Sequence, residues 1–103
     1  MSRALALLLP VLLLTGCAPP SAEAVYLSIV NDSTLQLKEV PDDDDIKEMG
    51  RDFCAYLNAE GFEDGMSDFI DNLQALGLTA DKAGDIGRAA IAAYCPAYSR
   101  YFE

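Results

Sequence analysis

Apolar residues recur at intervals of three and four in three stretches of the chain, the spacing that places side chains on one face of an α-helix. The first stretch follows the run Asp42–Asp45 and predicts a helix that ends at Gly61, because glycine readily adopts the left-handed conformation that satisfies the last carbonyls. The second predicts a helix with Asp64 as its N-cap and an end at Gly77. The inward-facing positions are Ile46, Met49, Phe53, Cys54 and Leu57 in the first stretch, and Met66, Phe69, Ile70, Leu73 and Leu76 in the second.

The third stretch predicts the clearest helix, with Thr79 as its N-cap and Pro96 ending or bending it. Its inner face carries small residues at Ala83, Gly87 and Ala90, which predicts a close approach by a neighbouring helix. The periodic positions are Ala83, Ile86, Gly87, Ala90, Ile91, Tyr94, Cys95 and Tyr98.

Residues 22–31 are compatible with a helix or a strand. Val25, Tyr26, Ile29 and Val30 have helical spacing, whereas the β-branched content suits a strand. We favour a short helix, followed by a connector over residues 33–41. The sequence therefore predicts an all-α domain of three to four helices.

The N-terminal segment is typical of an export signal. Arg3 supplies a positive charge, and residues 4–14 form an apolar run of about eleven residues. A membrane-spanning helix needs roughly 20 apolar residues, so this run suits a cleavable signal better than a permanent anchor.

The run Leu14, Thr15, Gly16 and Cys17 is similar to a lipobox, in which a diacylglyceryl group is attached to the thiol and the signal is cut just before it. The alternative is an ordinary secretory signal with an accidental cysteine. Lipidation of Cys17 would anchor the chain at the extracytoplasmic face of the cell membrane, because each buried methylene contributes about 0.8 kcal/mol.

This interpretation divides the chain into a signal peptide over residues 1–16, a Pro-containing tether over 17–21 and a helical domain over 22–103. The mature chain would have about 87 residues, which bury only a modest core. A covalent crosslink would therefore matter for its stability.

Two of the three cysteines remain once Cys17 carries lipid. Cys54 and Cys95 both lie on predicted buried faces, and an exported chain is exposed to an oxidising environment. A structural disulfide is the economical interpretation, and closing a loop of this length is worth about 4 kcal/mol in the chain-entropy model. A redox role has little support, because the chain has no C-x-x-C motif and no histidine.

The net charge of −10 becomes −11 when Arg3 is removed with the signal. Nucleic-acid binding depends on clustered Lys and Arg, and the remaining cations are scattered, so we expect no nucleic-acid partner. Anionic lipid headgroups would also repel the domain, which leaves the N-terminal lipid as the link to the membrane.

The run Asp42–Asp45 raises the question of a bound cation. The ligand spacing of an EF-hand fails here, because no Gly stands at the sixth position and no Glu at the twelfth. We expect Asp42 to cap a helix and the other aspartates to lie in its positive first turn, with no metal and no cofactor.

Aromatic residues concentrate at the C-terminus. Core packing is the favoured interpretation, with Tyr94 and Tyr98 on the inner face, and an exposed docking patch at Tyr101 and Phe102 is the alternative. The absence of histidine, of a nucleophile motif and of a phosphate-binding loop argues against an enzyme.

The chain resembles domain-of-unknown-function family 732, a group of small secreted actinobacterial and mycobacterial domains, here in a lipoprotein form. The family's closing A-x-x-Y-C-P is approximated by Ala90 or Ala92 before Tyr94-Cys95-Pro96, and its earlier G-x-x-[apolar]-C by residues 50–54. The resemblance covers residues 22–98 and implies an all-helical fold, a Cys54–Cys95 bond and a first helix near residues 25–30. The positions that carry it are Gly50, Phe53, Cys54, Leu57, Gly61, Ala83, Ala89, Ala90, Ile91, Tyr94, Cys95 and Pro96.

These features favour a non-enzymatic, membrane-anchored envelope lipoprotein that binds a protein or a cell-wall component. Two alternatives stay open: a phage or prophage exclusion lipoprotein, and an extracytoplasmic ligand or cation binder.

Overall fold

The computed structural model describes residues 21–35 and 41–102, and all regular secondary structure within these ranges is helical. The predicted fold class is confirmed. The elements in chain order are α2 (Ala22–Ser33), α3 (Asp43–Glu60), α4 (Phe62–Ala75), α5 (Ala80–Tyr94) and the 3-10 helix η1 (Pro96–Phe102). The predicted helix over residues 22–31 is therefore confirmed, and the predicted signal and lipobox lie outside the described residues.

Local hydrogen bonds set most helix boundaries. The Ser21 hydroxyl accepts from the Ala24 N–H at 3.0 Å, the Asp42 carboxylate from the Asp45 N–H at 2.8 Å, and the Thr79 hydroxyl from the Lys82 N–H at 3.2 Å. Each satisfies one backbone donor that the first turn of a helix leaves without an intrahelical partner. The predicted N-caps Asp42 and Thr79 are confirmed.

The end of α4 is a Schellman motif, as the sequence suggested. Gly77, at φ 107°, donates its N–H to the Gln74 carbonyl, and Leu78 donates to the Leu73 carbonyl. Leu73 and Leu78 are both buried, which supplies the apolar contact that accompanies this motif. Leu76 was predicted to face inward, but it is exposed because it lies at the C-cap, where the chain leaves the helix.

The predicted Asp64 cap is wrong. Helix α4 begins at Phe62, directly after Gly61, and no side chain caps it. Gly61 lies at φ 96°, a conformation that strongly favours glycine, and serves as the C-cap of α3 and the N-cap of α4 at once. Asp64 therefore lies inside the first turn of α4, where its charge suits the helix dipole.

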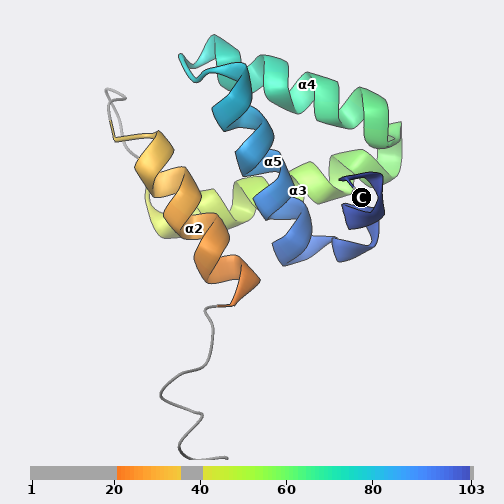
Figure 1. Cartoon of the computed structure of the whole chain (residues 1–103), viewed down its shortest axis with the longest axis horizontal. Helices are drawn as coiled ribbons and strands as arrows, with labels where there is room; N and C mark the ends of the chain where they lie inside the picture. Colours follow the sequence, from red (N-terminus) through yellow and green to blue (C-terminus); the bar gives the residue numbers. More distant parts are fainter. Residues whose placement is uncertain (1–20, 36–40, 103) are drawn as a thin grey trace, which may run out of the picture.

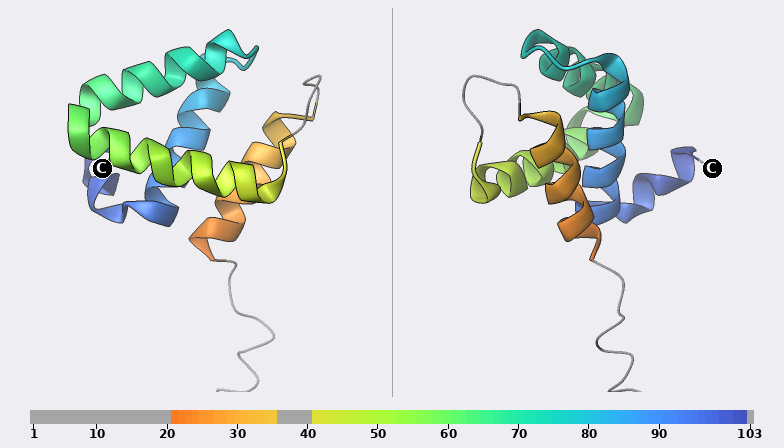
Figure 2. Two further views of the ribbon diagram at one scale, coloured as in Figure 1. Left: turned by 180° about the vertical axis from the view of Figure 1, so that it is seen from behind. Right: turned by 60° about the vertical axis from the view of Figure 1, so that its left-hand side comes forward.

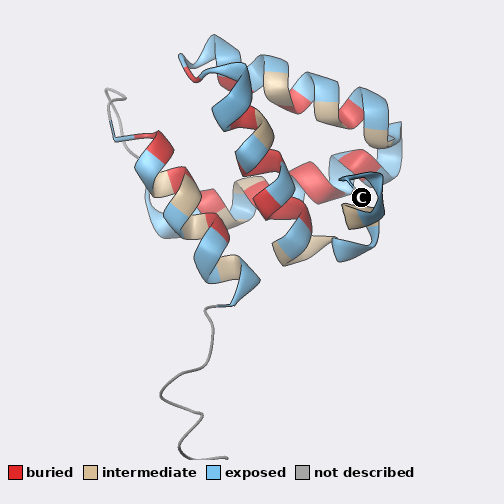
Figure 3. Cartoon of the chain, viewed as in Figure 1, coloured by how far each residue is buried: buried red, intermediate tan, exposed pale blue. Residues whose placement is uncertain are grey.

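Helix α5 is the central element and packs against α2, α3, α4 and η1 (Figure 1). Helices α3 and α4 join at Gly61 and diverge from it, as the view from behind in Figure 2 shows. Buried positions line the sides of the helices that face one another (Figure 3). The core consists of Tyr26, Val30, Ile46, Phe53, Leu57, Phe69, Leu73, Leu78, Ala83, Ile86, Ala89, Ala90 and Ile91.

A disulfide between Cys54 and Cys95 joins α3 to the end of α5, with an S–S distance of 2.03 Å. This is the pairing expected from the sequence. Close contact also joins α4 to its neighbours: buried Gly65 lies against Leu57 of α3, and Gly87 of α5 lies against Met66. The small inner face predicted for α5 therefore admits a side chain of α4.

Candidate binding surfaces

An open cleft of about 830 Å³ lies between α3 and α4. Its apolar lining consists of Met49 and Phe53 from α3 and Phe69 from α4. The Phe53 and Phe69 rings stack with centroids 4.0 Å apart and an interplanar angle of 24°. The polar lining consists of Asp45, Glu48, Asp52, Tyr56, Asp68, Asp71 and Asn72.

Helical spacing places the acidic side chains on the cleft. Asp45, Glu48 and Asp52 recur at three and four along α3, and Asp68 and Asp71 are three apart on α4. Like charges at these spacings destabilise a helix by about 0.2–0.5 kcal/mol per pair. The helix dipole accounts for Asp45 in the first turn of α3, but its influence has faded by the positions of Glu48 and Asp52.

One of these carboxylates is tied to the opposite helix. The Tyr56 hydroxyl donates a hydrogen bond to Asp68, from Oη to Oδ2 at 2.7 Å, and so bridges α3 and α4 at the rim. This hydrogen bond, with a smaller contribution from burial, raises the pKa of Tyr56 above its ordinary value. The bridge leaves the other rim carboxylates exposed to solvent.

The cleft has no cation of its own, since none of its lining residues is Lys or Arg. Among residues 21–35 and 41–102, the single ion pair joins Arg88 to Asp85 on α5. No three His, Cys, Asp or Glu side chains in these same ranges are placed to hold one metal ion. The lining therefore presents five carboxylates and no compensating cation.

This cleft was not predicted from the sequence. The acidic run identified there was Asp42–Asp45, and only Asp45 of that run lines the cleft. The available signal was the acidic spacing at 45, 48 and 52 beside Met49 and Phe53. Without the splay of α3 from α4, nothing connected that strip to Asp68 and Asp71.

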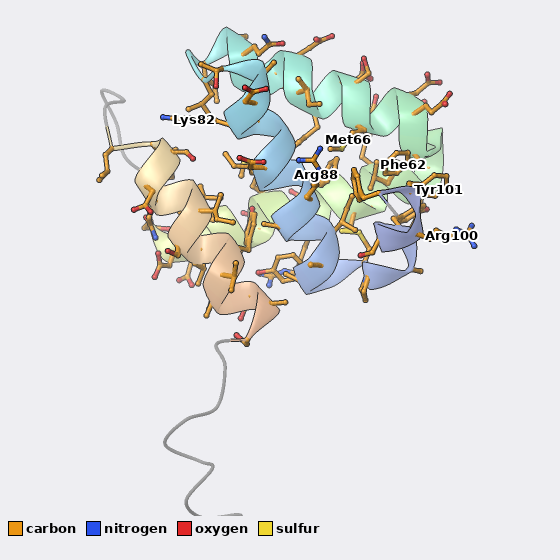
Figure 4. All side chains as sticks on the ribbon, in the orientation of Figure 1. Phe62, Met66, Lys82, Arg88, Arg100 and Tyr101 are labelled. Atoms are coloured by element: carbon orange, nitrogen blue, oxygen red, sulfur yellow. A yellow bond between two sulfur atoms is a disulfide. The ribbon has the colours of Figure 1, made fainter. Side chains whose placement is uncertain are left out.

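A second exposed surface lies at the C-terminus, where Phe62 of α4 contacts the aromatic residues of η1 (Figure 4). Its ring stacks on Tyr101 at 4.3 Å and 7°, and meets Phe102 edge-on at 5.6 Å. Arg88 lies over the Phe102 ring and Arg100 over the Tyr101 ring, at 5.2 and 5.3 Å from the centroids.

The favoured interpretation of the C-terminal aromatics as core residues is wrong for two of them. Tyr101 is 50% exposed and Phe102 37%, because η1 turns away from α5 after Pro96. Tyr94 and Tyr98 are only partly buried, packed against the core rather than inside it.

The described residues thus form an all-helical domain closed by one disulfide, with an acidic cleft on one pair of helices. Comparison with protein families places residues 21–97 in the family described as "Protein of unknown function (DUF732)", and the chain belongs to that family. Neither the curated proteins nor the solved structures gave a match. None of the described helices combines the length and the apolar character needed to cross a bilayer.

Proposed function

We propose that this protein is a non-enzymatic lipoprotein of the cell envelope, which binds another envelope protein in the cleft between α3 and α4. The single observation that carries the binding role is the cleft itself. It brings the stacked Phe53–Phe69 pair and five carboxylates from two helices together around one hollow of the surface. Concave sites with an apolar lining and a few placed polar groups are the usual form of a binding site.

The stiffness of the cleft supports this role. The Phe53–Phe69 stack fixes its floor, and Cys54, next to Phe53, is bonded to Cys95 of the segment that follows α5. The Tyr56–Asp68 hydrogen bond fixes the rim. A preformed site loses less conformational entropy on binding than a flexible one, so partner contacts translate more fully into affinity.

The proposed lipid anchor at Cys17 is inferred from the sequence alone. Cys17 stands four residues before Ser21, where α2 is capped, and four extended residues span at most about 14 Å. Lipid on Cys17 would therefore keep the domain close to the bilayer, within reach of other envelope proteins.

A non-enzymatic role agrees with the chemistry of the cleft. Its lining offers carboxylates, one phenol, one amide and apolar groups, and the whole chain has no histidine. A binding site needs only shape and charge from these groups, whereas catalysis in this cleft would have to rest on its carboxylates alone.

Site-specific photo-crosslinking in intact cells tests the binding role. A photoreactive amino acid at Glu48 should give one discrete crosslinked product, because Glu48 lines the cleft. The matched control is Gln74, which is exposed on α4 and lies outside the cleft. No product at Glu48, or the same product from both positions, would contradict the proposal.

Cell fractionation tests the anchor. The Cys17→Ser variant should move from the membrane fraction to the soluble or secreted fraction, because serine cannot form the thioether. Mass spectrometry of the native protein should find acyl chains on an N-terminal Cys17. An N-terminus without lipid would contradict the proposed anchor but not the proposed binding of a partner in the cleft.

A further inference from the structure

We infer that the occupant of the cleft is a cationic amphipathic segment of the partner protein, with an apolar side chain against the aromatic floor and Lys or Arg side chains at the carboxylate rim. This inference rests on the proposed binding role and adds the chemistry of the partner. It follows from the shape, the floor and the charge of the cleft.

The floor selects an apolar group. Phe53 and Phe69 are 4% and 9% exposed, so the stacked pair forms a nearly closed base of which only a small apolar part reaches the cleft. Met49 beside them is partly buried, and a thioether side chain adapts to differently shaped apolar partners. A cleft of about 830 Å³ has room for several side chains of a peptide.

The rim selects positive charge. Carboxylates stand on both walls, with Asp45, Glu48 and Asp52 on α3 facing Asp68 and Asp71 on α4 across the cleft. A segment in which basic residues flank an apolar residue would place the apolar side chain on the floor and a cation at each acidic wall. Its cations would also relieve the repulsion between neighbouring carboxylates on α3.

Other occupants fit less well. Anionic wall polymers and anionic lipid headgroups would be repelled by five carboxylates. A second copy carries a net charge of −10, or −11 without the signal, so two copies repel each other at long range. A protein segment rich in Lys or Arg has neither problem.

Peptide binding to the detergent-solubilised lipoprotein tests the inference. The probe is a labelled helical peptide of about four turns, with Lys four residues before and four residues after a central Leu so that all three share one face. Two matched peptides carry Glu in place of Lys, or Ser in place of Leu. Fluorescence anisotropy should show binding of the Lys–Leu peptide alone, weakened by salt because the rim contacts are exposed.

Two variants with the same change in charge locate the binding. The pair Glu48→Gln and Asp52→Asn should weaken binding about fivefold, since two ion pairs at the rim are lost. The pair Glu60→Gln and Glu63→Gln removes the same charge outside the cleft and should change binding less than twofold. All four side chains are exposed, and circular dichroism checks that both variants stay folded.

Equal weakening by the two variants would overturn the inference, since it would show attraction to the overall charge. Equal binding of all three peptides, or no binding, would overturn it as well. If Glu48 crosslinks to a partner but none of the peptides binds, the proposed binding role stands and only the inference that the occupant is cationic is refuted. Peptide binding without any crosslinked partner would instead refute the proposed cellular role.

Discussion

The hydroxyl of Tyr94 donates a hydrogen bond to the carboxylate of Glu23, with 2.6 Å between Oη and Oε2. This contact ties the last residue of α5 to the first turn of α2, 71 positions apart in the sequence. The Tyr94 ring also meets Tyr26 edge-on at 5.6 Å, and the Tyr26 hydroxyl donates to the Ile46 carbonyl at 2.6 Å. Two tyrosines therefore join three helices.

The Tyr94–Glu23 contact predicts a loss of stability at alkaline pH. Burial, followed by the hydrogen bond to Glu23, raises the pKa of Tyr94 to about 12, above its ordinary value of 10.0. The stabilisation is complete below the unfolded-state pKa and is lost as the pH rises from there through the folded-state pKa. Urea unfolding should show a midpoint that falls between about pH 10 and about pH 12.

The Tyr94→Phe variant isolates this contribution. We expect it to be less stable by about 1 kcal/mol at neutral pH and to lose less stability on alkalinisation. Absorbance of tyrosinate near 295 nm should lack the late-titrating component that Tyr94 supplies. Glu23→Gln, which keeps an acceptor without the charge, is the control and should lower the pKa of Tyr94 while largely preserving the fold. An unchanged alkaline profile in both variants would contradict the prediction.

Gly50 marks a close approach between α3 and the two tyrosine rings. A Cβ at this position would lie 2.7 Å from Tyr94 Cε2 and 3.0 Å from Tyr26 Cζ. Both rings are held by hydrogen bonds through their hydroxyls, so they have little freedom to move aside. We expect Gly50→Ala to destabilise the domain by about 1–3 kcal/mol in urea unfolding.

Gly84→Ala is the matched control for Gly50→Ala. Gly84 also lies within a helix, and a Cβ there would meet nothing within 4 Å. Alanine should stabilise the domain by up to about 1 kcal/mol, because it has the higher helix propensity. Equal effects of the two substitutions would show that the contact at Gly50 is not restrictive.

Local sequence rules predicted those parts of the fold that depend on local hydrogen bonds. Asp42 and Thr79 were predicted as caps from their residue type and their place before an apolar periodic stretch, and in the structure each accepts from a backbone N–H three residues ahead. The end of α4 followed from Gly77 in the same way. The Asp64 cap failed because Gly61 ends one helix and begins the next without a loop, and an Asn/Asp/Ser/Thr rule does not detect such a junction.

The candidate site was less accessible from the sequence, because it depends on how two helices are splayed. Buried Gly65 brings α4 against Leu57 of α3 near their junction, and α5 packs against both helices. That geometry opens the cleft between Asp52 and Asp68. Acidic spacing along α3 alone is equally compatible with a solvated face, so no local pattern linked the acidic positions of α3 to those of α4.

Phe62 holds the C-terminal 3-10 helix against α4. Its ring stacks on Tyr101 at 4.3 Å, and the Tyr98 hydroxyl adds a single hydrogen bond to Asn58. An aromatic pair contributes about 0.5–1.5 kcal/mol beyond its buried area. We therefore expect Phe62→Ala to accelerate chymotrypsin cleavage after Tyr98 and Tyr101 by about tenfold, because cleavage follows the population of the open form.

Leu76→Ala is the control for Phe62→Ala. Leu76 is 62% exposed at the end of α4 and is not part of the aromatic cluster. Its truncation should leave the cleavage rate near that of the unmodified protein. Equal protection of η1 in both variants would mean that the disulfide at Cys95, and not the stacked rings, restrains the C-terminal segment.

The Cys54–Cys95 bond should supply a large share of the stability of this small domain. It links residues 41 positions apart and so restricts the unfolded chain, which the chain-entropy model values at about 4 kcal/mol. Both sulfurs lie beside the packed core, where replacement by alanine leaves little unsatisfied polar surface. The Cys54→Ala/Cys95→Ala double variant should therefore unfold at a lower urea concentration, and reductant should shift the native protein to the same midpoint.

The same double variant should bind a cleft ligand more weakly even where it remains folded, because Cys54 is the next residue after Phe53, whose ring lies on the cleft floor. Binding retained at full strength in the folded double variant would show that the stack of Phe53 on Phe69 positions the floor without help from the crosslink.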